Sequence, residues 1–384
     1  MSSLRQPCIP TLPETAQVDE RNDEAADVNV SEYFLPSAAR AAALRAAMTA
    51  SWSESMVRVL GSHPEQASLP MVASLAGWAA SALDFGVYFD LCLASIDDQS
   101  SEAKAVGQAA IRWLQHRFLE EKSARGRHTE LQVSTLSELF YIGVDRARFL
   151  RWLDTDSQRS LAIGGIGPSR LICATRELYE AWFALGDVAP QLREEIAIIS
   201  PEVLLVRSDE EASTRFDSVS SFCLWGCMAL NTDTHFNSWD YFCSLVNGSA
   251  HSLLFAFSRQ QPLVLNPIDQ RSNSPLREDQ RPIDTVFHAA FASAREVWAL
   301  KRALTHSGRL PGDDMDPRRT GLLERLRTSA GVFWRCDEQL ARVAELSLLG
   351  EKILQESRDH VLSSAAVVRP LAVFDQRATD LMKC

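Results

Sequence analysis

The chain has 384 residues, of which 46% are hydrophobic and 23% are charged, values typical of a folded globular protein with a sizeable core in one large domain or two closely packed ones. Its 50 acidic residues outnumber its 39 basic ones, which gives a formal net charge of -11. This balance disfavours nucleic acid and anionic membrane surfaces as partners, because both attract positive charge.

Residues 1–30 are predicted to be a disordered leader. They carry several prolines and acids but no apolar core of the kind found in signal peptides. Residues 31–130 are predicted to form a helical N-terminal region, because apolar residues recur there at helical spacing. The expected helices span residues 36–60, 69–95 and 102–122. The polar residues 123–130, which include Gly126, are the best candidate for a domain boundary.

The chain is expected to be a cytoplasmic protein without a transmembrane segment. Its most apolar window, residues 69–93, is interrupted by Asp84 and Asp90, and a span needs roughly 20 uncharged residues. The eight cysteines lack the dense spacing of a disulfide scaffold. Cys223 and Cys227 have three residues between them and no second pair nearby, which disfavours a structural zinc site.

The central region, residues 131–263, begins its regular pattern with a glycine-rich loop at 162–168. A helix is predicted to start at Pro168 or Ser169 and to end before Gly186. Residues 222–230 are almost wholly apolar and would suit a strand by that criterion alone. Helical spacing instead favours a buried helix; the residues that carry this spacing are Val219, Phe222, Cys223, Cys227 and Leu230.

A polar segment, Asn231-Thr-Asp-Thr-His235, interrupts this helix. Asn237 with Asp240 resembles a capping box that starts another helix, for which Gly248 is a natural end. A short helix follows at residues 253–257. The C-terminal region, residues 264–384, is predicted to hold three helices, near 284–305, 320–335 and 339–354. These elements together predict an all-α fold.

The segment Met228-Ala-Leu-Asn-Thr-Asp-Thr-His235 resembles the MLNTDLH string of the Sec-seven-type exchange-factor domain for Arf GTPases. Asp240-Tyr-Phe-Cys-Ser-Leu-Val-Asn-Gly248 is similar to the family's acidic-DFI-x-N-x-x-G segment, and Leu254-Phe255 and Arg259-Gln-Gln-Pro262 resemble its LY and KNEP. Upstream, the family's FRLPGEAQ loop can be laid on residues 163–170, and Ile172, Glu177 and Tyr179 fit the following helix. The resemblance covers residues 163–263.

This resemblance implies an all-helical domain in which the two motifs form an apolar groove for the switch regions of an Arf-type small GTPase. The protein would then regulate a GTPase in vesicle trafficking. The residues implied to line the groove are Leu230, Asn231, Thr232, Asp233 and His235. In the family, a glutamate enters the nucleotide site, repels the β-phosphate and competes for Mg²⁺. That glutamate falls on Pro168, and no acid occurs between Leu161 and Arg176.

Two versions of this function follow: an exchange factor with a substitute for the glutamate, or a catalytically silent protein that binds a GTPase as a scaffold. Residues 231–235 are also consistent with a polar turn that satisfies two helix ends. A rival of another class is a metal-dependent enzyme in which His235, His251 and His288 gather around an ion with Asp233. No two of these histidines have the spacing of an HExxH site, and the P-loop and G-x-S-x-G motifs are missing. No enzyme class and no cofactor are predicted.

Overall fold

The fold is that of a computed structural model. It describes residues 33–61, 75, 78, 80–96, 100–121, 130–141, 146–153, 163–208, 216–273, 280–307 and 317–368. The leader predicted for residues 1–30 and all but the last residue of the boundary predicted at 123–130 lie outside the described residues.

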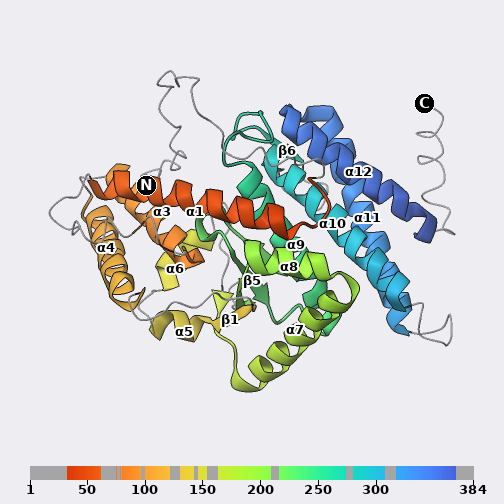
Figure 1. The fold of residues 1–384 in the computed structure, drawn as a ribbon, viewed down its shortest axis with the longest axis horizontal. Coiled ribbons are helices and arrows are strands. Elements are labelled where there is room, and N and C mark those ends of the chain that lie inside the picture. The colour runs from red at the N-terminus through yellow and green to blue at the C-terminus, as the bar shows by residue number, and fades with distance from the viewer. Residues whose placement is uncertain are drawn as a thin grey trace.

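The described residues are mainly helical, as predicted. The helices are α1 (Ala38–Gly61), α3 (Ala82–Ile96), α4 (Ser101–Glu121), α5 (Leu136–Tyr141), α6 (Arg146–Leu153), α7 (Pro168–Val188), α8 (Pro190–Ile199), α9 (Ser238–Phe257), α10 (Ile283–Ser307), α11 (Pro317–Val343) and α12 (Leu348–Val368). Figure 1 shows α3 and α4 at one end of the molecule and α10, α11 and α12 at the other, with short strands between them.

A small sheet, which the sequence analysis did not predict, lies at the centre. Its strands are β1 (Gln132–Thr135), β2 (Ile163–Gly164), β3 (Glu202–Ser208), β4 (Ser218–Ser220) and β5 (Cys227–Asn231). The order is β1-β3-β5-β4; β1, β3 and β5 are parallel, whereas β4 runs antiparallel to β5 and β2 antiparallel to β3. A separate hairpin joins β6 (Arg271–Asn273) to β7 (Gln280–Pro282).

The buried helix predicted over residues 219–230 is therefore wrong. This segment forms β4, a single 3-10 turn at Phe222–Leu224, and β5. Every residue of β5 is buried, because β5 lies between β3 and β4 and helices cover the sheet. A parallel strand that is buried on both faces has a continuous apolar sequence, which the helical spacing of a few residues imitates.

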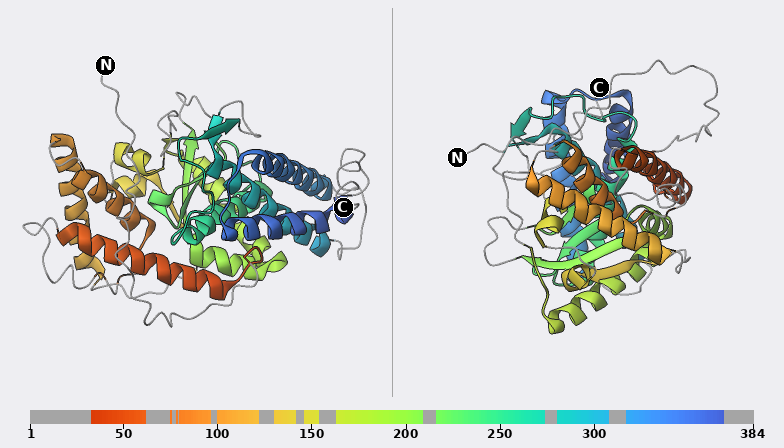
Figure 2. Two further views of the ribbon diagram at one scale, coloured as in Figure 1. Left: turned by 90° about the horizontal axis from the view of Figure 1, so that it is seen from above. Right: turned by 90° about the vertical axis from the view of Figure 1, so that its left-hand side faces the viewer.

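Helices pack on both faces of the sheet (Figure 2). Side chains on one face share a hydrophobic cluster with α7, α8 and the first half of α9: Val203, Leu205, Met228 and Leu230. Side chains on the other face belong to a second cluster, which includes α1 and α3: Leu204, Val206, Cys227 and Ala229. The second cluster extends from Phe34 to Val361, so one core joins the N-terminal, central and C-terminal regions.

Two helix ends also differ from the prediction. Helix α9 does not stop at Gly248 but continues to Phe257. In the C-terminal region, α11 continues past the predicted end at residue 335 to Val343. Residues 344–347 are not helical, and α12 begins at Leu348. Within the part of the chain that the structure describes, no helix is both long and apolar enough to cross a bilayer.

Candidate partner-binding site

The loop of residues 231–236 connects the carboxyl end of β5 to the start of α9. Thr232 continues the sheet ladder, since its N–H donates to the carbonyl of Val206. At the other end, the predicted capping box is confirmed: the Asn237 side chain accepts from the backbone N–H of Asp240, and the Asp240 carboxylate accepts from the N–H of Asn237. The loop is thus held by a buried strand on one side and a capped helix on the other.

Asn231 fixes the start of the loop from inside the core. Its Nδ2 donates to Ser208 Oγ (2.7 Å) and to the carbonyl of Phe216 (2.8 Å), and its Oδ1 accepts from the N–H of Asp233 (3.0 Å). The side chain is completely buried. Because the buried amide donates two hydrogen bonds and accepts one, its role is to hold the loop in this conformation.

The side chain of His235, near the end of the loop, contacts the residue at which the loop begins. Its Nδ1 lies 2.6 Å from the carbonyl of Asn231, and its Nε2 lies 2.7 Å from Ser244 Oγ. Because a carbonyl can only accept, Nδ1 carries the proton and Ser244 donates to Nε2. Burial lowers the pKa of His235, which favours this neutral form.

The Ser244–His235 pair has the connectivity of a nucleophile and its base, but it lacks their surroundings. Ser244 is buried, and a backbone carbonyl stands where a catalytic carboxylate would orient the imidazole. The pair therefore holds α9 against the loop.

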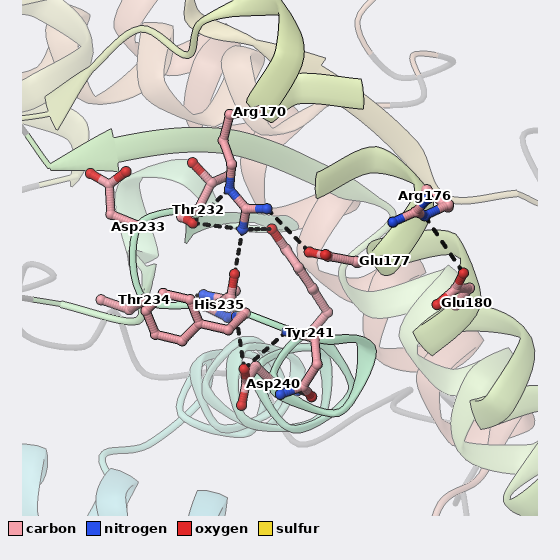
Figure 3. Close-up of polar contacts among 12 residues, drawn as sticks. Arg170, Arg176, Glu177, Glu180, Thr232, Asp233, Thr234, His235, Asp240 and Tyr241 are labelled. Carbon is pink, nitrogen blue, oxygen red and sulfur yellow. Dashed lines mark hydrogen bonds and ion pairs between the residues drawn. The ribbon is translucent and has the colours of Figure 1, made fainter. Parts of the chain in front are cut away.

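Arg170, in the first turn of α7, ties the glycine-rich loop region to residues 232–235. Its guanidinium donates to the carbonyl of Thr232 (2.7 and 3.0 Å) and to the carbonyl of His235, and it pairs with Glu177 at 3.3 Å. Figure 3 shows this side chain pointing into the loop, beside Tyr241 of α9. The two segments aligned with the exchange-factor motifs are thus in direct contact.

Four of the five residues expected to bind a partner are buried: Leu230, Asn231, Thr232 and His235. They cannot contact a partner directly, and their expected contact role is corrected to one of shaping the loop. Asp233 is the exception: it is exposed, accepts from the N–H of Ser208 at 3.2 Å, and lies 3.7 Å from Arg207. Phe236, which the sequence analysis did not select, is exposed beside it.

The position of the family's glutamate is occupied by a helix start. Pro168 is the first residue of α7, Gly167 caps the helix without a side-chain hydrogen bond, and no acid lies in the first turn. The fixed φ of proline suits this position, and the described segment of residues 163–176 offers no carboxylate in its place.

An exposed apolar row, which the ion-paired Arg176 interrupts, runs along the outer face of α7. Ile172 is 71% exposed, Tyr179 38% and Phe183 61%. Their spacing of seven and four residues puts them on one side of the helix, whereas the opposite side packs in the core through Ala174, Leu178, Ala181, Trp182 and Leu185. The sequence shows that this helix is apolar on two sides, but it does not show which of the two sides is buried and which is exposed.

The three-histidine metal site of the rival hypothesis is wrong. Both ring nitrogens of His235 are engaged by Asn231 and Ser244, whereas His251 contacts His288. Among the described residues, no three side chains of His, Cys, Asp or Glu gather in a way that could hold a metal ion.

Comparison with family models and with curated protein sequences adds no relative. No family model matches the chain, and no curated protein sequence matches it significantly.

Proposed function

We propose that this chain is a cytoplasmic, protein-binding regulator of an Arf-type small GTPase, acting in vesicle trafficking as a scaffold without a catalytic glutamate. The partner-binding surface consists of the apolar row of α7 (Ile172, Tyr179, Phe183) and the exposed loop residues Asp233 and Phe236. The choice of partner comes from the resemblance of residues 163–263 to the exchange-factor domain.

The exposed row of α7 is the observation that carries this proposal. Ile172 and Tyr179 are also the apolar residues through which this helix resembles the family, and both remain accessible. Exposed apolar side chains gathered on one helix face mark surfaces that bind other proteins. The switch regions of a GTPase supply apolar side chains of the kind that would cover them.

Exchange by the family's mechanism is not part of the proposal. A proline at the start of α7 carries no charge that could repel a phosphate or compete for Mg²⁺, and two acidic groups at the loop are committed to other partners. Asp233 pairs with Arg207, and Asp240 caps α9 and pairs with Arg325 at 2.6 Å.

The binding test compares nucleotide-free Arf-type GTPases with full-length protein and three variants. Ile172→Asp and Phe183→Asp place a charge on the exposed row, so binding should fall by about tenfold or more, as for residues at the centre of an interface. Leu348→Asp is the matched control, because Leu348 is 77% exposed at the start of α12, away from α7 (Figure 1). Equal binding by all four proteins would contradict the proposed surface.

A second measurement separates the two versions of the function. Release of a fluorescent guanine nucleotide from the GTPase is followed with and without this protein. Binding without acceleration is expected for a scaffold. Accelerated release would contradict the scaffold and require another residue to replace the glutamate.

A further inference from the structure

His251 and His288 form an imidazole pair between α9 and α10. Their Nδ1 atoms are 3.1 Å apart, and the rings are stacked, with centroids 5.3 Å apart and planes at 25°. Phe255 packs against the His288 ring, and Phe222 packs against Phe255. Both histidines are partly buried.

The separation of the two nitrogens fits a shared ligand. When two imidazole nitrogens bind one ion at about 2.1 Å, they lie about 3.0 Å apart at a right angle and about 3.4 Å apart at the tetrahedral angle. The observed 3.1 Å falls inside this range. The same distance also suits a hydrogen bond from one Nδ1 to the other, which is the form that the pair takes without an ion.

The geometry points to a two-imidazole site, His251 Nδ1 with His288 Nδ1, for a divalent transition-metal ion of the nitrogen-preferring class such as Cu²⁺ or Zn²⁺. The described residues provide no third protein ligand, so water completes the coordination. The bound ion would replace the hydrogen bond between the rings and link α9 to α10. This site is independent of the proposed GTPase-binding surface.

The test is a titration of full-length protein, first freed of metal by chelation and dialysis, with CuCl₂ at neutral pH. Calorimetry should show saturable binding, and MgCl₂ should show none, because a hard cation prefers oxygen ligands. His251→Gln and His288→Gln should each weaken the copper affinity by about tenfold or more, since even second-shell changes have effects of that size. His306→Gln, an exposed histidine in the last turn of the same helix α10, is the matched control and should bind as the unchanged protein does.

Electron paramagnetic resonance of the copper-loaded, unchanged protein gives a result that does not depend on any variant folding. Hyperfine coupling to two equivalent imidazole nitrogens is expected. Absence of that coupling, no saturable binding, or the same affinity in all variants would overturn the site and leave the pair as a hydrogen bond only.

Discussion

Asn231 and Asp233 are two residues apart in one loop but have opposite environments. Asn231 is completely buried and makes three hydrogen bonds, to Ser208, Phe216 and Asp233. The Asp233 carboxylate is exposed and lies 3.7 Å from Arg207. Stability should therefore depend on the first residue, whereas partner binding can depend on the second.

Asn231→Ala should lower the free energy of unfolding by about 3 kcal/mol, because the buried carbonyl of Phe216 and the partly buried groups of Ser208 and Asp233 lose their partner. Asp233→Ala should lower it by about 0.5 kcal/mol or less, since an exposed ion pair contributes little. Urea unfolding followed by far-UV circular dichroism measures both. In the GTPase-binding assay, Asp233→Ala should abolish pull-down while its spectrum stays unchanged; retained binding would remove Asp233 from the surface.

The sequence could identify the polar loop but not the side chains that face out of it. The turn residues and the capping box of Asn237 and Asp240 depend on local chemistry, which a short segment contains. Burial of Asn231 depends on the register of β5 with β3, where Asn231 pairs with Val206. That pairing joins residues distant in sequence, so Asn and Asp in the loop could not be ranked by exposure.

At the scale of the elements, Gly248 sets how closely α9 packs on the sheet. A Cβ at this position would lie 2.9 Å from the sulfur of Met228 and 3.3 Å from Ser220 Oγ. This contact explains why the glycine stands inside α9 and does not end it. Spacing and residue type alone could not predict this, because both a helix end and a close approach favour glycine.

Gly248→Ala should destabilise the protein by about 1–3 kcal/mol, as overpacking of a core does. Gly321→Ala is the matched control: Gly321 lies in α11, and a Cβ there would meet nothing within 4 Å. Alanine should stabilise that helix by about 0.5–1 kcal/mol. The midpoint temperature of thermal unfolding should thus fall for Gly248→Ala and rise for Gly321→Ala. A Gly248→Ala protein as stable as the unchanged one would show that α9 can move away from β5.

The contact of α7 with the loop depends on Arg170, so its removal should loosen one element against another. Arg170→Met keeps the length of the side chain but loses the hydrogen bonds to the carbonyls of Thr232 and His235. Amide hydrogen exchange at residues 232–236 should become faster, while exchange in β3 and β5 stays slow. Unchanged exchange in the loop would show that Asn231 and His235 hold it without α7.

For the whole molecule, three neutral histidines stand between separate elements. His235 joins the loop to α9, and His251 and His288 join α9 to α10. The pKa of each is lowered by burial, to about 3 for His251 and about 4 for His288. A folded-state pKa below the unfolded value of about 6.5 means that the unfolded chain binds more protons as the pH falls.

Stability should therefore be greatest above about pH 6.5 and should decrease as the pH falls from about 6.5 towards 4, by about 1.4 kcal/mol per pH unit for each histidine that remains neutral in the folded state. Urea unfolding of metal-free protein across this range measures the slope. The double variant His251→Gln and His288→Gln should lose two of the three contributions and so have a shallower slope, whereas His306→Gln, an exposed histidine of α10, should keep the original one. A slope that is the same in all three proteins would contradict this contribution of the pair, because the pH dependence would then come from other groups.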